Sequence, residues 1–202
     1  MKKFLFIDVD NTLANLTKHY LTWYNNLFIY NTLDEDPFNT DILENFDAYD
    51  FIDYTIRNRK TKSVISYEEE KNRLIKIFNS EGFWESIPLL PNADKILYEL
   101  DKEYETYLVT KPSFKSKYFF SGRLFWVENR LSDFDHEKLI FCKNKSLLRS
   151  DGILIDDFPD NLINWRGKTI KVKYKFNEKT KSNKEFFPYE WEKVPDLIKE
   201  LI

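Results

Sequence analysis

The sequence FLFIDVDNT runs from Phe4 to Thr12 and changes from apolar to acidic halfway along. Its first four residues form an unbroken apolar run, and turn-forming residues follow. A short apolar run that ends in a turn is typical of a strand buried on both faces, as in a parallel α/β sheet. The sequence therefore predicts a buried first strand with two carboxylates, Asp8 and Asp10, at its carboxyl end.

Further short apolar runs predict additional strands, at 107–109, 139–141, 153–155 and 169–172. Apolar residues at helical spacing lie between or after these runs, at 93–100, 124–131 and 195–202. Strands that alternate with helices indicate the α/β class. We therefore expect a three-layer core, with a parallel sheet between two layers of helices.

About ninety residues separate the first two predicted strands, far more than a simple crossover connection needs. Residues 16–30 have helical character, and Ser66 to Glu69 form a capping box that opens another helix. This stretch is expected to be a mainly helical insertion. The predicted organisation is a core made of residues 1–15 and 89–202, with an insertion over residues 16–88.

The chain has 202 residues, a net charge of −3, four glycines, two histidines and one cysteine. The glycines are too far apart for a glycine-rich phosphate loop, and two histidines cannot build a multi-histidine zinc site. Any catalysis is therefore expected to rest on carboxylates, hydroxyls and amines. We expect no targeting signal or membrane span, and the single cysteine favours a reducing, cytoplasmic setting.

Charge is distributed unevenly. Residues 34–53 contain eight acids and no lysine or arginine, which favours a solvated surface over a calcium site. Residues 168–184 contain seven lysines and one acid, and Lys171, Lys173 and Lys175 alternate with apolar residues. This alternation favours a half-buried edge strand whose solvent face carries the lysines. A strip that contacts phosphate backbones is the alternative, although the near-neutral net charge argues against general nucleic-acid binding.

Acidic pairs end two of the predicted strands: Asp8 with Asp10, and Asp156 with Asp157. Either pair alone could simply cap a helix, but ligands of open parallel sheets bind beyond the carboxyl ends of the strands. Carboxylates held close together repel each other unless a cation or a proton intervenes, and hard oxygen ligands suit Mg²⁺. The two pairs together therefore predict a magnesium site.

A hydroxyl and an amine are expected at the same edge, because Thr110 ends another strand and Lys145 follows a fourth. Each would be an ordinary loop residue if taken singly. A phosphate bound near several carboxylates needs such partners to offset repulsion. The order of acid pair, hydroxyl, lysine and acid pair therefore indicates phosphate chemistry.

These segments, Asp8-Val9-Asp10-Asn11-Thr12, Thr110, Lys145 and Asp156-Asp157, resemble the four motifs of the haloacid dehalogenase (HAD) superfamily of phosphatases. Three others, GFWE at 82–85, FWVEN at 125–129 and LIDDFPD at 154–160, resemble the 5'(3')-deoxyribonucleotidase family. The resemblance implies a Rossmann-like core with a small helical cap inserted after the first strand. The insertion over residues 16–88 would be that cap.

The resemblance also implies catalytic roles. Asp8 would attack phosphorus and form an aspartyl-phosphate, and Asp10 would act as general acid and then general base. Asp8, Asp156 and the backbone carbonyl of Asp10 would hold Mg²⁺. Thr110 and Lys145 would bind the transferring phosphoryl oxygens.

Two further roles come from the same resemblance. Asp157 would orient the groups that bind the metal. Arg123 occupies a position where the family has a phosphate-contacting lysine, so it is expected to contact the phosphate. Leu16 stands where the family often has a phenylalanine that stacks on the base. Candidates for the rest of the base pocket, each also a candidate core residue, are Phe46, Tyr49, Phe83 and Trp84.

The expected function is Mg²⁺-dependent dephosphorylation of nucleoside monophosphates, with deoxy forms preferred. Two alternatives remain open: a related phosphatase acting on a sugar phosphate or another small phosphoester, and a non-catalytic nucleotide-binding module that uses the basic strand. The expected partner is a small-molecule nucleotide, without membrane or nucleic acid. Self-association as a homodimer also stays open.

Overall fold

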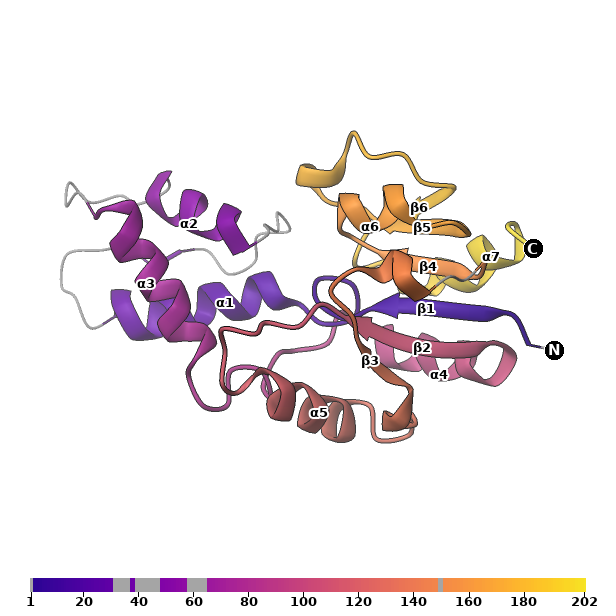
Figure 1. Ribbon diagram of the computed structural model, residues 1–202, viewed down its shortest axis with the longest axis horizontal. Helices are drawn as coiled ribbons and strands as arrows, with labels where there is room; N and C mark the ends of the chain where they lie inside the picture. Colours follow the sequence, from indigo (N-terminus) through magenta and orange to yellow (C-terminus); the bar gives the residue numbers. More distant parts are fainter. Residues whose placement is uncertain (1, 31–36, 39–47, 58–64, 149–150) are drawn as a thin grey trace.

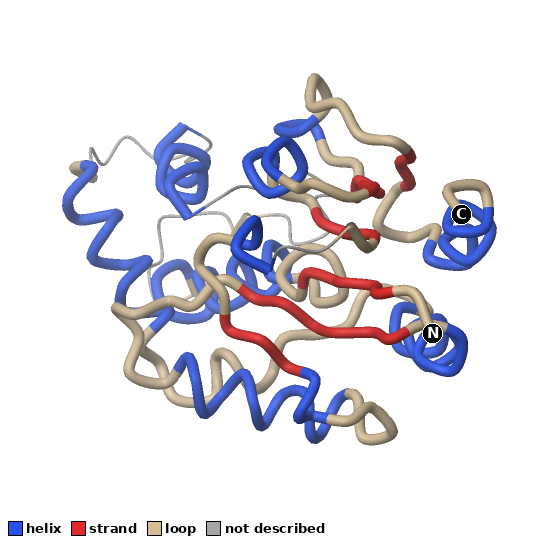
Figure 2. The backbone as a smooth tube through the Cα atoms, turned by 45° about the vertical axis from the view of Figure 1, so that its right-hand side comes forward, coloured by secondary structure: helices blue, strands red, loops and turns tan. Residues whose placement is uncertain are grey.

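The computed structural model describes residues 2–30, 37–38, 48–57, 65–148 and 151–202. A six-stranded sheet with the order β3-β2-β1-β4-β5-β6 forms its centre, and every pairing is parallel. The strands are β1 (Phe4–Asp8), β2 (Glu105–Thr110), β3 (Leu139–Phe141), β4 (Ile153–Asp156), β5 (Lys168–Val172) and β6 (Lys184–Phe186). Helices lie on both sides of this sheet (Figure 2), so the expected α/β fold is confirmed.

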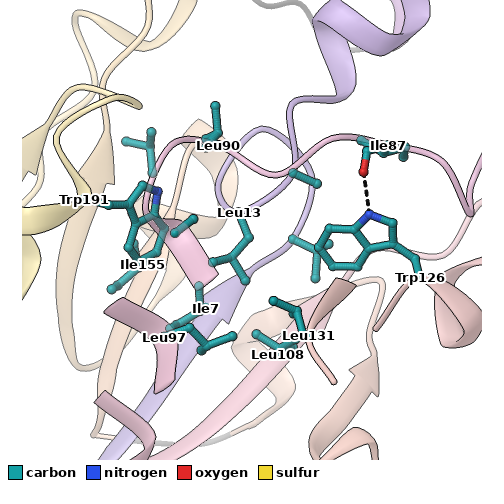
Figure 3. Packing of buried hydrophobic residues seen from close by; sticks show 14 of the residues in the cluster. Ile7, Leu13, Ile87, Leu90, Leu97, Leu108, Trp126, Leu131, Ile155 and Trp191 are labelled. Carbon is teal, nitrogen blue, oxygen red and sulfur yellow. Dashed lines mark hydrogen bonds between the residues drawn. The ribbon is translucent and has the colours of Figure 1, made fainter. Parts of the chain in front are cut away.

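Four helices follow strands of the sheet: α4 (Ala93–Glu103), α5 (Phe119–Arg130), α6 (Pro159–Asn164) and α7 (Val194–Lys199). One sheet face, which carries Ile7 and Leu108, packs with Leu97 of α4 and Trp126 of α5 in the larger hydrophobic cluster (Figure 3). The opposite face presents a smaller cluster around Phe6. Among the described helices, none is both long and apolar enough to cross a membrane.

The long connection between β1 and β2 contains α1 (Leu16–Tyr24), α2 (Ala48–Arg57) and α3 (Tyr67–Phe78). A π-helical turn extends α1 to Ile29. The predicted cap of α3 is present, because the Ser66 side chain accepts a hydrogen bond from the Glu69 N–H at 3.2 Å. In Figure 1 these helices lie beyond the carboxyl ends of the strands, which point toward them. Helices α1, α2 and α3 therefore lie next to the sheet edge where the site was expected.

Two antiparallel chain segments join this helical connection to the sheet. Ala14 and Leu89 form a β-bridge. The Asn15 N–H donates to the Pro88 carbonyl at 2.8 Å, and the Leu90 N–H donates to the Leu13 carbonyl at 2.7 Å. The segments that leave and re-enter the sheet region are thus hydrogen-bonded side by side.

The structure corrects three expectations. Helix α5 begins at Phe119, five residues before the expected start at Leu124. The sheet has an additional strand, β6, and β5 is therefore not an edge strand. Lys171 is also not on a solvent face: its side chain is buried, and its ammonium donates to the carbonyls of Asn177 and Thr180. Most of the acidic stretch at 34–53 lies outside the described residues.

A buried histidine at the base of the insertion makes stability depend on pH. The Nε2 of His19 is 2.9 Å from the Phe83 carbonyl, and burial lowers the pKa of His19 to about 4. Between pH 6.5 and 4 the unfolded chain binds a proton at His19 that the folded chain does not, so the free energy of unfolding falls as pH falls. This loss amounts to about 2 kcal/mol at pH 5.

We expect His19→Gln, which keeps an N–H donor for Phe83, to lose about 2 kcal/mol less than the wild type between pH 7 and pH 5. Urea unfolding at the two pH values measures the free energy of unfolding of each protein. Subtracting the change in the variant from that in the wild type cancels the contributions of titrating groups that both proteins share. His136→Gln is the matched control, because His136 is exposed. Equal pH dependence in wild type and His19→Gln would contradict the assignment.

Candidate active site

The two aspartates of the first motif precede a tight turn at residues 11–13. Asp8 is the last residue of β1, and Asp10 forms a β-bridge with Ala14 across the turn. Asn11 lies in the left-handed region at φ 58°, which asparagine tolerates better than most residues. Its N–H donates to the Ala14 carbonyl at 2.7 Å, and its Oδ1 accepts from the Thr17 N–H at 3.0 Å. These contacts hold the turn, and with it both aspartates, in one conformation.

Three buried carboxylates and one amine converge at the carboxyl end of the sheet. Oxygens of Asp8, Asp156 and Asp157 lie within 4.8 Å of one another. The side chain of Lys145 is 1% exposed; its ammonium donates to Asp8 and, over 2.6 Å, to Oδ2 of Asp156. Asn161 of α6 donates to the same oxygen at 3.0 Å. Residues from three different motifs are therefore brought together here.

Burial and crowding set the proton affinities of this cluster. Burial raises the pKa of Asp8 to about 8; Lys145 opposes this rise, while Asp156 and Asp10 add to it. Burial also raises the pKa of Asp157, with further contributions from Asp8 and Asp156. Burial disfavours the charged form of Lys145, but Asp156 and Asp8 outweigh it and raise the pKa of the amine. One amine does not neutralise three carboxylates.

The donor set fits a hard divalent cation. The oxygens of Asp8, Asp156 and Asp157 are ligands that Mg²⁺ prefers, and a cation among them would relieve their mutual repulsion. The carboxylate of Asp10 points elsewhere: Oδ1 is 2.5 Å from Nη2 of Arg123, and Oδ2 accepts from the Thr110 hydroxyl at 3.4 Å. The Asp10 carboxylate therefore lies outside the cluster formed by Asp8, Asp156 and Asp157.

Arg123 is fully buried within a set of aromatic rings. Its guanidinium carbon lies 5.4 Å from the ring centroids of Trp84 and Trp126 and 5.6 Å from that of Phe119. Such cation–π contacts stabilise a charge that burial would otherwise penalise. Its Nε and Nη1 have no hydrogen-bond partner in the described part of the chain. The ion pair with Asp10 is thus the polar contact that orients this guanidinium.

A cavity of about 270 Å³ opens beside the aspartates. Asp8, Asp10 and Asp157 form one side of it. Among the residues predicted for the base pocket, Leu16 and Trp84 line the cavity. The lining combines apolar rings from the insertion with polar groups from the sheet, which suits a small molecule that has one apolar end and one charged end.

The other predicted pocket residues are placed differently. Phe83 is fully buried, packs edge-on against Trp84 at 5.0 Å, and is not among the described residues that line the cavity. Tyr49 belongs to α2, but its side chain lies outside the described part of the structure, and Phe46 lies outside the described residues altogether.

Comparison with known proteins gives the family. A family model described as "5' nucleotidase, deoxy (Pyrimidine), cytosolic type C protein" matches residues 2–201. The chain belongs to this family. Relatives include the 5'(3')-deoxyribonucleotidase of Bacillus subtilis strain 168, 24% identical over 196 residues, which cover 96% of this chain and 97% of the relative. The 5'(3')-deoxyribonucleotidase of Clostridium acetobutylicum is 25% identical over 169 residues, which cover 84% and 81%.

Comparison with solved structures also identifies the fold of this chain. A haloacid dehalogenase-like protein from Agrobacterium tumefaciens superposes with a TM-score of 0.62 at 8% identity, over 99% of both chains. The predicted HAD resemblance is therefore confirmed. As a member of the 5' nucleotidase family, the chain is a phosphoric monoester hydrolase.

Several cavity residues of this nucleotidase were not predicted from sequence. Lys111, Pro112 and Ser113 directly follow Thr110, and Phe158 and Asn161 lie one and four residues after Asp157; their proximity to the motifs could have identified them. Phe51, Phe78, Phe119 and Phe176 also line the cavity. No local pattern distinguishes these rings from core residues, since only tertiary packing brings them to the site.

The Arg123–Asp10 pair predicts a specific defect in this phosphatase. We expect Arg123→Lys to lower kcat about tenfold or more, because an ammonium cannot fill the space among three rings and hold the Asp10 carboxylate in the same position. Arg130→Lys is the matched control, since Arg130 lies on the same helix and is exposed. Steady-state kinetics on one phosphomonoester measures both variants. An unchanged kcat in Arg123→Lys would show that the pair has no part in turnover.

Proposed function

We propose that the protein is a Mg²⁺-dependent phosphatase that dephosphorylates nucleoside monophosphates, preferentially deoxy forms, through an aspartyl-phosphate. The observation that carries this proposal is that two neighbouring aspartates have different surroundings. Asp8 belongs to the buried carboxylate cluster, whereas the Asp10 carboxylate stands apart from it, and both line one cavity. A nucleophile and a separate proton carrier are what a two-step phosphoryl transfer requires.

In the first step a carboxylate oxygen of Asp8 attacks phosphorus, and the bond between phosphorus and the nucleoside oxygen breaks. Asp10 protonates the departing oxygen, so a nucleoside leaves and an aspartyl-phosphate remains. In the second step Asp10 takes a proton from water, and the oxygen of that water displaces phosphate from Asp8. Because Asp10 regains the proton it donated, the enzyme returns to its starting state.

Charge on the transferring group is balanced by cations and hydrogen-bond donors. Mg²⁺, when bound by Asp8, Asp156 and the backbone carbonyl of Asp10, would neutralise phosphate charge and favour in-line attack. Asp157 would orient this set. Among the side chains, Thr110, Lys145 and Arg123 would receive the phosphoryl oxygens. Nε and Nη1 of Arg123, which have no hydrogen-bond partner in the described part of the chain, would be the donors for this purpose.

The nucleoside would occupy the apolar part of the cavity. Leu16 and Phe51 come from the helical connection, and Trp84 comes from its return path to the sheet. We propose that residues 16–88 form a cap over the core of residues 1–15 and 89–202. Rings on this side offer stacking surfaces for a base. The position of the cap above the strand ends supports this arrangement.

Phosphate release from a panel of 5'- and 3'-nucleotides, with and without a chelator, tests the proposal. We expect release from deoxynucleoside monophosphates that falls at least a hundredfold with chelator and recovers with added Mg²⁺. A sugar phosphate in the same panel provides the comparison for substrate class. Chelator-resistant release, or a hundredfold preference for the sugar phosphate, would contradict the metal dependence or the nucleotide assignment respectively.

A further inference from the structure

A second hollow, of about 450 Å³, lies at the opposite end of the sheet order from β3. It is formed by the residues that follow β5 and β6, drawn in orange and yellow at the upper right of Figure 1. Its size falls in the range of about 300–1,000 Å³ that is usual for small-molecule sites. The lining consists of Lys173, Tyr174, Lys175, Glu178, Phe187, Pro188 and Tyr189.

Two exposed and mutually stacked rings give this hollow an aromatic side. Phe187 is 40% exposed and Tyr189 is 49% exposed. Their ring planes are within 6° of parallel, and their centroids are 5.6 Å apart. Large aromatic side chains that remain exposed in pairs beside a hollow are suited to stacking on a planar ligand such as a nucleic-acid base.

Cationic side chains border the same rings. The Lys173 ammonium lies 5.1 Å from the centroid of the Phe187 ring and pairs with Glu185 at 2.7 Å. Lys175 is exposed, and so is the one acid of the lining, Glu178. The surrounding segment, 168–184, has a surplus of lysines. A ligand that stacks on the rings and pairs with the lysines would have a planar end and an anionic end.

We propose that this hollow is a second binding site, separate from the catalytic cavity, for a free nucleoside phosphate. Its base stacks on Phe187 and Tyr189, and its phosphate is bound by Lys173 and Lys175. The dimensions fit one nucleotide rather than a longer strand, because the described lining offers one ring pair and two lysines. This assignment does not depend on which phosphoester the catalytic site hydrolyses.

The segment 174–177 contacts both cavities. The Tyr174 hydroxyl donates to the Asn11 carbonyl at 2.7 Å, and the Asn177 side chain donates to the Asp157 carbonyl at 2.7 Å. Phe176, which stacks on Tyr174 at 6.0 Å between centroids, lines the catalytic cavity. A ligand on the outer side of Tyr174 therefore contacts the same loop that holds two catalytic turns.

Photolabelling tests the site directly. The probe is 8-azidoadenosine monophosphate with the whole protein in chelator, so that no metal-dependent turnover consumes it. We expect saturable labelling of the tryptic peptide 185–193, which contains both rings. Lys175→Ala is expected to raise the half-saturating probe concentration at least fivefold, since it removes a phosphate partner and leaves the labelled rings intact. The matched control is Lys179→Ala, an exposed lysine outside the lining, which should leave this concentration unchanged.

Competition identifies the occupant. Unlabelled deoxyadenosine monophosphate is expected to protect peptide 185–193 at lower nucleotide concentrations than a ten-residue oligothymidylate does. Stronger protection by the oligonucleotide would replace the free nucleotide with a nucleic-acid strand and overturn the proposal. Labelling confined to peptides of the catalytic cavity, or equal half-saturation in Lys175→Ala and wild type, would also overturn it.

Discussion

Asp8→Asn is expected to lower kcat by at least about 10⁴-fold, the scale of loss seen when a covalent nucleophile is removed. An amide oxygen is a poor nucleophile and cannot form the aspartyl-phosphate. The variant should still fold, because burial raises the pKa of Asp8 to about 8, so the folded protein already disfavours a charge at this position and accepts a neutral isostere. Single-turnover phosphate release, with circular dichroism to check the fold, measures both effects.

The matched control for this variant is Asp101→Asn. Asp101 also pairs with a lysine, Lys138 at 2.9 Å, but it does so in helix α4, outside the cavity lining. We expect its turnover to equal that of the wild type within about twofold, since partly exposed ion pairs contribute little. Activity retained by Asp8→Asn would contradict the nucleophile assignment.

Lys145→Met is expected to show the second large effect, and it should act on stability as well as on turnover. Removing the amine leaves Asp8 and Asp156 without the cation that they share, and breaking a buried ion pair in this way costs about 3–5 kcal/mol. We therefore expect a loss of this size in the free energy of unfolding in chelator, and a fall in kcat/KM of about 10³-fold or more. Added Mg²⁺ should restore part of the stability, because it supplies positive charge to the same carboxylates.

Lys171→Met separates the two effects. Lys171 is as deeply buried as Lys145, but its partners are the Asn177 and Thr180 carbonyls and Glu185, none of which belongs to the carboxylate cluster. This variant should lose stability, keep kcat within about fivefold, and gain nothing specific from Mg²⁺. If both methionine variants responded equally to Mg²⁺ in urea unfolding, the cation would not be binding at the Lys145 cluster.

The parts of the fold that could be predicted are those encoded by local pattern. Unbroken apolar runs identify β1 and β4, and the parallel arrangement then places Asp8 and Asp156 at one edge. Strand β6 could not be predicted in the same way, because Lys184-Glu185-Phe186 contains no apolar run. The burial of Lys171 could not be predicted either, since its partners are the Asn177 and Thr180 carbonyls of the following loop and Glu185 of β6.

For the candidate site too, some features follow from local sequence pattern and others depend on tertiary packing. Motif order alone predicts that Asp8, Thr110 and Lys145 share a site, because Asp8 and Thr110 end strands and Lys145 lies four residues after the end of another. The surroundings of Arg123 depend instead on Trp84, which is remote in sequence and reaches α5 only through tertiary packing. Gly122 permits this approach: a Cβ there would lie 2.8 Å from Cβ of Trp84. A contact of that kind leaves no periodic signal in a single sequence.

The antiparallel bridge between Ala14 and Leu89 has a consequence for engineering. Because these two residues are paired neighbours, a two-residue hairpin turn could join them directly and remove the whole stretch between. Such a shortened chain would retain every strand of the sheet and all of the aspartates at its edge. It would lose the cavity-lining side chains of Leu16, Phe51, Phe78 and Trp84, so the cavity would be open to bulky phosphoesters. Replacing the covering helices is therefore expected to change substrate choice only if the contacts of Thr17 with Asn11 and of Trp84 with Arg123 are kept, because these contacts hold the catalytic turn and its arginine.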